Sequence, residues 1–571
     1  MYDVIFVTPN MTGEGKEECN GTLQLATILK NQGVSCNIIQ FFRIGDVDNF
    51  DDFLQNFENQ IGEIAPKIVS FYCRCDTYHI MLRLAQRIKM RWENIYTVLG
   101  GPQSDITSED TIRLIPWVDY VCCGEGERTI YPFFSSLLKN EPDLSVPGLV
   151  YRCNETVIKN PRPELIANLD ELPMLDYSMF HFDTEIKANQ SIDVGRGCPF
   201  NCTFCSTNSF WGRTFRLKSP QRIVEEIKHL HDVYGKTQFG FSHDMFTFNR
   251  NKVKETCALL RTLDFDVEWG CSARLDCIDE ELIDVMAESG LSRIYLGIET
   301  GSPRMQKLIN KNLKLENALR IVKYLRSKDI GVIASFIYGF PEENEEDLSQ
   351  TISLMLQLMH LGKVQIQTHL CTFHLGTELS KKYGAEMTPV DYYSDQTGEF
   401  AIEECKDLIK GYPQLFQHML EYKTELRTKL RYFSQFMNVW KFLEPVYYYI
   451  SKKYPENRLI DMYYDFVEAN KEILPHLDEA PEYMIGIWLG TRDCFVKRFA
   501  EDENYDIMQD YIRFKTIENS QEVKNGETVT DMFCFAPGDL RKKPIGEIKR
   551  CVAMVTWSKN ERTVACYPIE E

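Results

Sequence analysis

Short apolar runs alternate with amphipathic stretches along the first 140 residues. The apolar runs have the length of buried strands and lie at 4–9, 34–41, 67–73, 96–99 and 120–122. The stretches with helical spacing of apolar residues lie at 23–29, 52–64, 79–91 and 127–138. This alternation predicts an α/β fold that begins with a doubly wound, Rossmann-like parallel sheet. Such sheets bind ligands in the loops at the carboxyl ends of their strands.

Two glycine-containing loops follow predicted strands in this region. Gly100-Gly101-Pro102 closes one strand, and Gly124-Glu125-Gly126-Glu127 closes the next. Glycines at a strand end let the backbone approach a flat or phosphorylated ligand closely. An ordinary tight turn remains the alternative for either loop.

The segment Gly195-Arg196-Gly197 opens a loop that contains Cys198, Cys202 and Cys205 in the spacing C-x-x-x-C-x-x-C. Thiolates at this spacing can converge on one metal centre and are the usual ligands of iron–sulfur clusters. Three ligands leave one iron of a four-iron cluster open to a substrate. The alternative is a zinc site, which would need a fourth ligand such as His181, His229 or His231.

The cysteine motif, with Phe204 just before the third cysteine, resembles that of the radical SAM superfamily, and the resemblance covers residues 186–385. Further strand-like runs follow the motif at 239–247, 269–276, 293–302, 331–339 and 365–373, and a helix is expected at 220–234. The resemblance implies a partial (β/α)₆ barrel with its site at the carboxyl ends of the strands.

The resemblance also implies the site residues. Cys198, Cys202 and Cys205 would hold a 4Fe-4S cluster. The residues expected to contact SAM are Phe204, Asp244, Arg274, Glu299, Ile337 and Phe340. This chain departs from the family pattern at His243, which replaces the first of two acids, and at Ser335, which replaces a glycine. The barrel mouth has further candidates, for which packing or hydrogen bonding behind the site is the preferred interpretation, namely His243, Cys271, His369 and His374.

The stretches 98–102 and 118–127 are similar to the cobalamin-binding domain that precedes many radical SAM domains. The resemblance implies that cobalamin contacts Gly100, Gly101, Pro102, Gly124 and Glu125. The chain lacks the Asp-x-His-x-x-Gly loop that supplies a histidine to cobalt in other cobalamin proteins.

The expected domains are a cobalamin-binding-like domain (1–140), a linker (141–185), the radical SAM barrel (186–385) and a C-terminal region (386–571). The C-terminal region reads as mostly helical at 404–475, where aromatic residues recur at core spacing. A terminal β-hairpin is expected from 552–557 and 563–568. We expect this region to cap the barrel and recognise substrate.

Composition narrows the class of protein. The chain has 571 residues, of which 44% are hydrophobic, and this excludes a disordered chain. Its net charge of −20 argues against a nucleic-acid partner. The sequence contains no signal-like N-terminus and no apolar window long enough to span a membrane, so a cytoplasmic protein is expected. In that compartment its 19 cysteines would stay reduced.

The resemblance implies an anaerobic enzyme that reductively cleaves SAM to methionine and a 5′-deoxyadenosyl radical. With cobalamin present, the expected outcome is C-methylation of a peptide or small-molecule substrate. An external electron donor such as flavodoxin or ferredoxin would be required. The alternatives are a radical cyclisation, epimerisation or rearrangement without methyl transfer, and a zinc-dependent binding protein without enzymatic activity.

Overall fold

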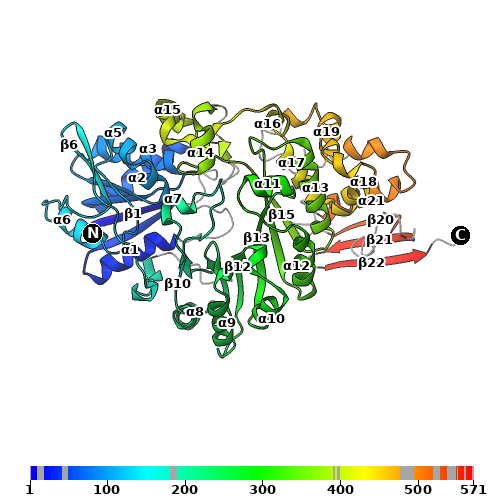
Figure 1. Ribbon diagram of the computed structural model, residues 1–571, viewed down its shortest axis with the longest axis horizontal. Helices are drawn as coiled ribbons and strands as arrows, with labels where there is room; N and C mark the ends of the chain where they lie inside the picture. The colour runs from blue at the N-terminus through cyan, green and yellow to red at the C-terminus, as the bar shows by residue number, and fades with distance from the viewer. Residues whose placement is uncertain are drawn as a thin grey trace. The chain divides into compact units, whose positions relative to one another are not determined.

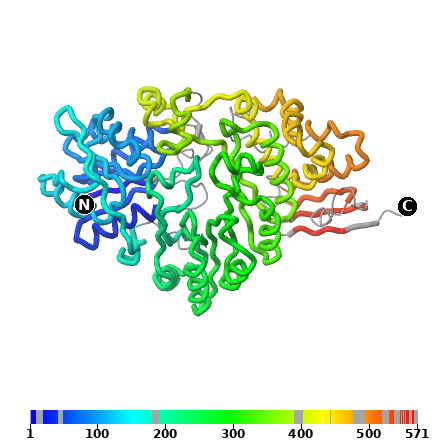
Figure 2. Tube along the Cα trace, viewed as in Figure 1, coloured from blue at the N-terminus to red at the C-terminus, as the bar shows by residue number. Residues whose placement is uncertain are grey.

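The structure is a computed structural model, and it describes residues 2–9, 19–41, 49–179, 190–389, 393–394, 399–400, 402–475, 494–518, 528–535, 545, 548, 551–558 and 561–568. The chain divides into two compact units, which can be followed by residue number in Figure 2. The first unit comprises Met1–Tyr295, Ile309–Lys311 and Cys371–Lys423. The second unit comprises Leu296–Leu308, Asn312–Leu370 and Thr424–Glu571.

The first unit contains a seven-stranded sheet of order β2-β1-β3-β4-β5-β6-β7 (Figure 1). Strands β1 to β5 pair in parallel, which confirms the predicted doubly wound sheet. Strands β6 and β7 extend it in antiparallel fashion. The strands are β1 (Val4–Pro9), β2 (Cys36–Phe41), β3 (Ile68–Tyr72), β4 (Tyr96–Gly100), β5 (Tyr120–Cys122), β6 (Leu149–Cys153) and β7 (Thr156–Lys159).

Helices connect these strands and cover the sheet. Because strand β1 is central, its side chains from Val4 to Val7 are almost completely buried. The four predicted helices are present, and α4 and α5 between β4 and β5 were not predicted. The helices are α1 (Asn20–Asn31), α2 (Phe50–Ile64), α3 (Tyr78–Arg91), α4 (Pro102–Ile106), α5 (Ser108–Leu114) and α6 (Ile130–Leu138).

A second sheet has the strand order β8-β11-β12-β13-β14-β15. It contains all five strands that were predicted after the cysteine motif, and β8, which precedes them in the sequence. Strand β13 passes from the first unit to the second after Tyr295. The strands are β8 (Gln190–Asp193), β11 (Gln238–Ser242), β12 (Glu268–Ala273), β13 (Leu291–Glu299), β14 (Gly331–Tyr338) and β15 (Val364–Leu370). The intervening helices are α8 (Pro220–Tyr234), α9 (Arg250–Leu260), α10 (Glu280–Glu288), α11 (Pro303–Leu308), α12 (Glu316–Ser327) and α13 (Glu345–Met359).

The C-terminal part of the second unit is mostly helical, as predicted. Its aromatic residues form a core in which Phe436, Trp440 and Tyr447 are fully buried against one another. The helices are α16 (Glu425–Lys429), α17 (Phe433–Phe442), α18 (Glu444–Ser451), α19 (Ile460–Ala469) and α21 (Tyr505–Glu518).

The predicted terminal hairpin is present, and a third strand that was not predicted joins it. Strands β20 (Val529–Phe533), β21 (Cys551–Ser558) and β22 (Glu561–Pro568) form an antiparallel sheet, drawn as side-by-side arrows in Figure 1. Among the described residues, no helix has the length and apolar character needed to cross a membrane.

Candidate functional site

The three-cysteine loop is closed at its base by two short paired strands. Strand β9 (Gly195–Arg196) precedes the loop, strand β10 (Arg216–Leu217) follows it, and the two pair in antiparallel fashion. Gly197 adopts φ +80, and a Cβ there would lie 2.4 Å from the Thr214 carbonyl oxygen. Only glycine fits at this position, so the turn into Cys198 has a strict local requirement.

Segment 309–311 holds the cysteine loop from the side. The Thr203 amide donates to the Ile309 carbonyl oxygen at 3.0 Å, and the Asn310 side chain donates to the Asn201 carbonyl oxygen at 2.8 Å. Two backbone groups of the loop are therefore fixed by a segment far away in the sequence.

The three thiols are half-buried and not in disulfides, which leaves them available as ligands. Burial raises the pKa of the Cys198 thiol to about 11, and the nearby Cys205, Asp244 and Cys202 add to this shift. Burial also raises the pKa of Cys205. Because the Cys198 thiol senses Cys202, Cys205 and Asp244, these four sequence-predicted groups lie in one electrostatic neighbourhood. Three soft donors on one loop have the chemistry that an iron–sulfur cluster requires.

Arg274 follows β12 and lies beside this loop. Its guanidinium lies 3.9 Å from the Cys202 sulfur and 3.9 Å from the centre of the Phe200 ring. It also donates to the Lys311 carbonyl oxygen and pairs with Asp276 at 2.8 Å. Arg274 therefore combines an ion pair with a contact to the cysteine loop, and its contact with SAM stays a prediction.

The remaining SAM candidates show different exposure. Phe204 is half-buried in the cysteine loop. In the second unit, Glu299 ends β13, Ile337 lies in β14, and Phe340 follows that strand. Glu299 and Phe340 are buried, and Glu299 has φ +68, which is uncommon for a residue with a side chain. Such strained backbone is concentrated at functional sites.

The turn after β14 is fixed on both sides of Gly339. The Gly339 amide donates to the Glu343 carboxylate at 2.5 Å, and its carbonyl oxygen accepts from Arg427 at 2.5 Å. Both partners are buried. This turn carries the element that the resemblance assigns to SAM.

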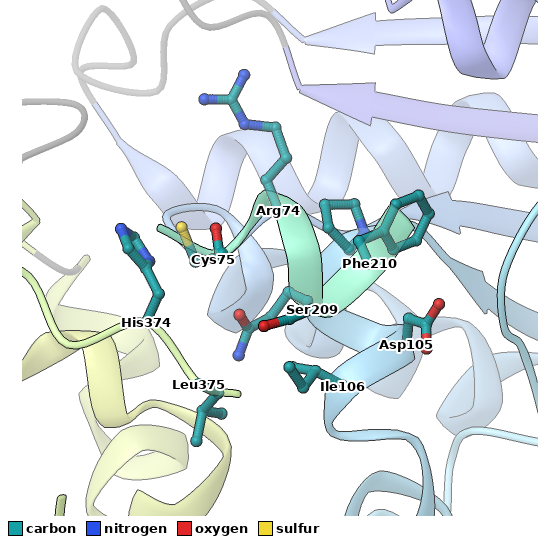
Figure 3. A pocket seen from close by; sticks show the side chains of 11 residues that line it. Arg74, Cys75, Asp105, Ile106, Ser209, Phe210, His374 and Leu375 are labelled. Carbon is teal, nitrogen blue, oxygen red and sulfur yellow. The ribbon is translucent and has the colours of Figure 1, made fainter. Parts of the chain in front are cut away.

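A cavity of about 140 Å³ that opens to solvent lies in the first unit (Figure 3). It is formed by the loop after β3, by α4, by α7 (Thr207–Trp211) with Ser206, and by the segment after β15. Its lining residues are Arg74, Cys75, Pro102, Gln103, Asp105, Ile106, Ser206, Ser209, Phe210, His374 and Leu375. Because Ser206 directly follows Cys205, the cavity connects the N-terminal domain with the cysteine loop.

Within the described residues of the first unit, some buried polar atoms have no hydrogen-bond partner. They include the hydroxyls of Thr8 and Thr77 and the amide oxygen of Asn20. Unpaired buried polar atoms are costly and call for a partner. These unpaired atoms are of the kind that a polar cofactor such as cobalamin would satisfy.

The predicted cobalamin residues differ in their placement. Pro102 lines the cavity, and a Cβ added to Gly100 would meet nothing within 4 Å. Gly101 adopts φ +101 in a tight turn against Cys73. The Gly124 amide donates to Asp105, which lines the cavity. The Glu125 carboxylate is buried in ion pairs with Arg196 and Arg216.

The four candidates for the barrel mouth also differ in their surroundings. His374 lines the cavity. His243 is buried, accepts from the Met245 amide at 2.8 Å and packs against Phe215. Cys271 is buried and His369 is half-buried. Of the zinc-ligand candidates, His231 stacks on Phe265, and His181 lies outside the described residues. Among the side chains that the structure describes, no three His, Cys, Asp or Glu converge on a single ion.

Several residues of the site were not found from the sequence. Asp105, Ser209 and Phe210 lie on helices α4 and α7, and Arg427 lies on α16. None of these four residues belongs to a sequence motif. The only signal in the sequence that could have found any of them was the position of α7 directly after the third cysteine.

Two family models match the chain. Residues 12–132 match the B12 binding domain, and residues 192–355 match the radical SAM superfamily. These matches confirm the cobalamin, SAM and cluster cofactors expected from the sequence, and they favour an iron–sulfur cluster over zinc on the three cysteines.

Two individual proteins are similar to this chain over more than half of its length. An uncharacterized methyltransferase of Pyrococcus horikoshii is 32% identical over 302 residues, which cover 52% of this chain and 66% of that protein. An anaerobic magnesium-protoporphyrin IX monomethyl ester cyclase of Rubrivivax gelatinosus is 26% identical over 366 residues, covering 62% and 65%. The matches thus span about two thirds of the length of these relatives.

The fold agrees with a solved structure of the cobalamin-dependent S-adenosylmethionine radical enzyme OxsB with aqua-cobalamin bound. The TM-score is 0.59 at 14% identity, and the match covers 90% of this chain and 84% of that one. The chain is therefore a member of the radical SAM superfamily that carries an N-terminal B12-binding domain.

Proposed function

We propose that this chain is a cobalamin-dependent radical SAM methyltransferase that methylates an unactivated carbon of a peptide or small molecule. The observation that carries the proposal is the cavity of the first unit. Its wall includes Cys75 and Pro102 of the B12-binding domain and Ser206, the residue next to the third cluster cysteine. A cofactor in this cavity would lie beside the cysteine loop.

The residues of this chain have distinct roles in the proposal. Cys198, Cys202 and Cys205 hold the cluster, whose bound SAM supplies the radical, while cobalamin supplies the methyl group. Arg274 balances negative charge at the cluster, because its guanidinium lies 3.9 Å from the Cys202 sulfur. Glu299, Ile337 and Phe340 contact SAM, and Phe204 and Asp244 complete its site. The protein contributes positioning and the exclusion of water, and the cofactors carry the difficult chemistry.

The partners follow from the chemistry. A radical SAM enzyme needs a substrate and a source of electrons, and we propose flavodoxin or ferredoxin as the donor. We place the protein in the cytoplasm of an anaerobic cell, where its free thiols and the cluster would be preserved. The C-terminal region, 386–571, is proposed to recognise substrate.

A second candidate is a radical cyclisation or rearrangement without methyl transfer. The similarity to the magnesium-protoporphyrin IX monomethyl ester cyclase favours keeping it. In that case the chain would cleave SAM without transferring its methyl group.

The test is anaerobic reconstitution of the full chain with iron, sulfide and hydroxocobalamin, followed by gel filtration. The proposal predicts retained cobalamin and, after reduction with SAM present, 5′-deoxyadenosine. Loss of cobalamin with 5′-deoxyadenosine still formed would support the second candidate. A protein that takes up no iron would contradict both.

A further inference from the structure

The loop after β5 and the cysteine loop are joined by a buried network of charges in the first unit. Glu125 accepts from Arg196 at 2.9 Å and from Arg216 at 2.8 Å, and Glu127 accepts from Arg196 at 2.5 Å. The side chains of Glu125, Glu127 and Arg196 are at most 6% exposed. Charges this deeply buried are stable only when they are paired with good geometry.

The Glu125 carboxylate has no oxygen left for a cofactor. One oxygen accepts from Arg196 and Arg216, and the other accepts from the Ile166 amide at 2.6 Å and from Arg216 at 3.0 Å. A carboxylate with both oxygens occupied in this way acts within the protein. The resemblance of its glycine-containing loop to cobalamin-binding domains had instead implied that Glu125 contacts cobalamin.

The two arginines lie at the base of the cysteine loop. Arg196 and Arg216 are cross-strand partners in β9 and β10, the strands that enter and leave the loop. Arg196 lies two residues before Cys198. Both guanidiniums lie over the Trp211 ring, at 5.4 Å and 5.7 Å from its centre. Glu125 therefore joins both ends of the cluster-binding segment to one point of the B12-binding domain.

A second contact supports the same connection. Arg162 pairs with Asp105 of α4 and donates to the Phe210 carbonyl oxygen at 3.0 Å. Asp105 in turn accepts from the Gly124 amide at 2.8 Å, next to Glu125. Helix α7, which follows the third cysteine, is thus tied to the same loop after β5.

We propose that Glu125 is a positioning residue for the iron–sulfur cluster, and that it acts through Arg196 and Arg216 on the loop of Cys198, Cys202 and Cys205. The inference rests on the proposed function only in that these cysteines bind a cluster. It assigns to the B12-binding domain a direct part in setting the geometry of the cluster and of the SAM bound to it. It removes Glu125 from the residues that touch cobalamin.

The test compares Glu125→Gln with a matched control, Glu58→Gln. Glu58 is also a buried carboxylate shared by two arginines, Arg87 and Arg91, but it lies on α2. Both full-length variants are reconstituted anaerobically. The measurements are iron content, the electron paramagnetic resonance spectrum of the reduced cluster with and without SAM, retained cobalamin and the thermal melting temperature.

Glu125→Gln is expected to retain cobalamin, to change the cluster spectrum and to weaken SAM binding at least tenfold. Glu58→Gln is expected to lower the melting temperature alone. Rescue of the spectrum by Glu125→Asp would agree with positioning by charge. If Glu125→Gln does not fold, Arg216→Lys is measured in its place. This substitution keeps the positive charge but removes the planar guanidinium and its several N–H donors, and it is expected to give the same spectral change.

The inference would be overturned if Glu125→Gln showed the cluster spectrum and the SAM affinity of the wild-type chain. The same result in Arg216→Lys would overturn it where that variant replaces Glu125→Gln. Loss of cobalamin with an unchanged cluster would overturn it as well, because Glu125 would then be a cofactor ligand. If the wild-type chain itself takes up no iron, the proposed function fails, and this result is distinct from either of the other two.

Discussion

Arg427 donates a hydrogen bond to the carbonyl oxygen of Gly339, in the turn that follows β14. The arginine comes from α16 of the C-terminal region, and the glycine belongs to the element assigned to SAM. Both lie in the second unit. The C-terminal region therefore contributes directly to the turn that the resemblance assigns to SAM, in addition to the substrate recognition proposed for it.

Replacing Arg427 with Ala should weaken SAM binding. A hydrogen bond from a charged group contributes about 1.5–3 kcal/mol, and a loss of about 1.4 kcal/mol lowers affinity tenfold. We expect roughly a tenfold or larger increase in the Kd for SAM, measured by equilibrium binding to the reconstituted protein. Lys429→Ala, on the same helix but in an exposed pair with Glu425, is the control. Equal affinities of the two variants would contradict this role.

Replacing Glu343 with Gln should change how stability depends on pH. Burial raises the pKa of Glu343 to about 8, from an ordinary value of 4.5. The folded protein therefore keeps the proton that the unfolded chain releases, and the free energy of unfolding falls as the pH rises from 4.5 towards 8. Glu343→Gln should remove this part of the fall, measured by denaturant unfolding at several pH values.

The exposed neighbour Glu346 provides the control for this experiment. Glu346→Gln should keep the pH dependence of the wild-type chain. If Glu343→Gln and the wild-type chain lose stability in parallel over this pH range, Glu343 is not the group that holds the proton.

Each of the substitutions Cys198→Ala, Cys202→Ala and Cys205→Ala should abolish a stable cluster, because each removes one of three thiolate ligands. Iron content and the absorbance of the reconstituted protein measure the loss. Cys153→Ala replaces an exposed cysteine and should leave both unchanged. Retention of a full cluster in any of the three variants would show that the ligand set has been assigned incorrectly.

Substitutions at two adjacent glycines should distinguish an effect on folding from an effect on cobalamin binding. Gly101→Ala should destabilise the protein by about 1–3 kcal/mol, because Gly101 has φ +101 and its added Cβ would lie 2.8 Å from the Cys73 carbonyl oxygen. Gly100→Ala should fold normally, since nothing lies within 4 Å of its added Cβ, but it should retain less cobalamin. Thermal melting and cobalamin content after gel filtration measure the two effects. Normal cobalamin retention in Gly100→Ala would remove Gly100 from the cofactor site.

Most strands of both sheets could be predicted because their apolar runs are continuous and buried. The cysteine loop could be predicted because its chemistry depends on local spacing. Helices α4 and α5 were missed because they are short and follow a glycine-rich turn, and β20 because Thr530 and Asp531 interrupt its short apolar run.

The role of Glu125 could not be predicted, because its partners are 71 and 91 residues away in the sequence. The same holds for Arg427, which is 88 residues from Gly339. Both residues act through charges that the fold alone brings together. Motif spacing predicted ligands for the cofactors, whereas the residues proposed to position those ligands could be found only in the structure.

The most direct test of the central claim is product analysis of the reconstituted enzyme, reduced anaerobically with SAM in the presence and absence of cobalamin. If the chain is a cobalamin-dependent methyltransferase, mass spectrometry should detect 5′-deoxyadenosine, together with S-adenosylhomocysteine that forms only when cobalamin is bound. Formation of 5′-deoxyadenosine alone, in equal amounts with and without cobalamin, would contradict this account.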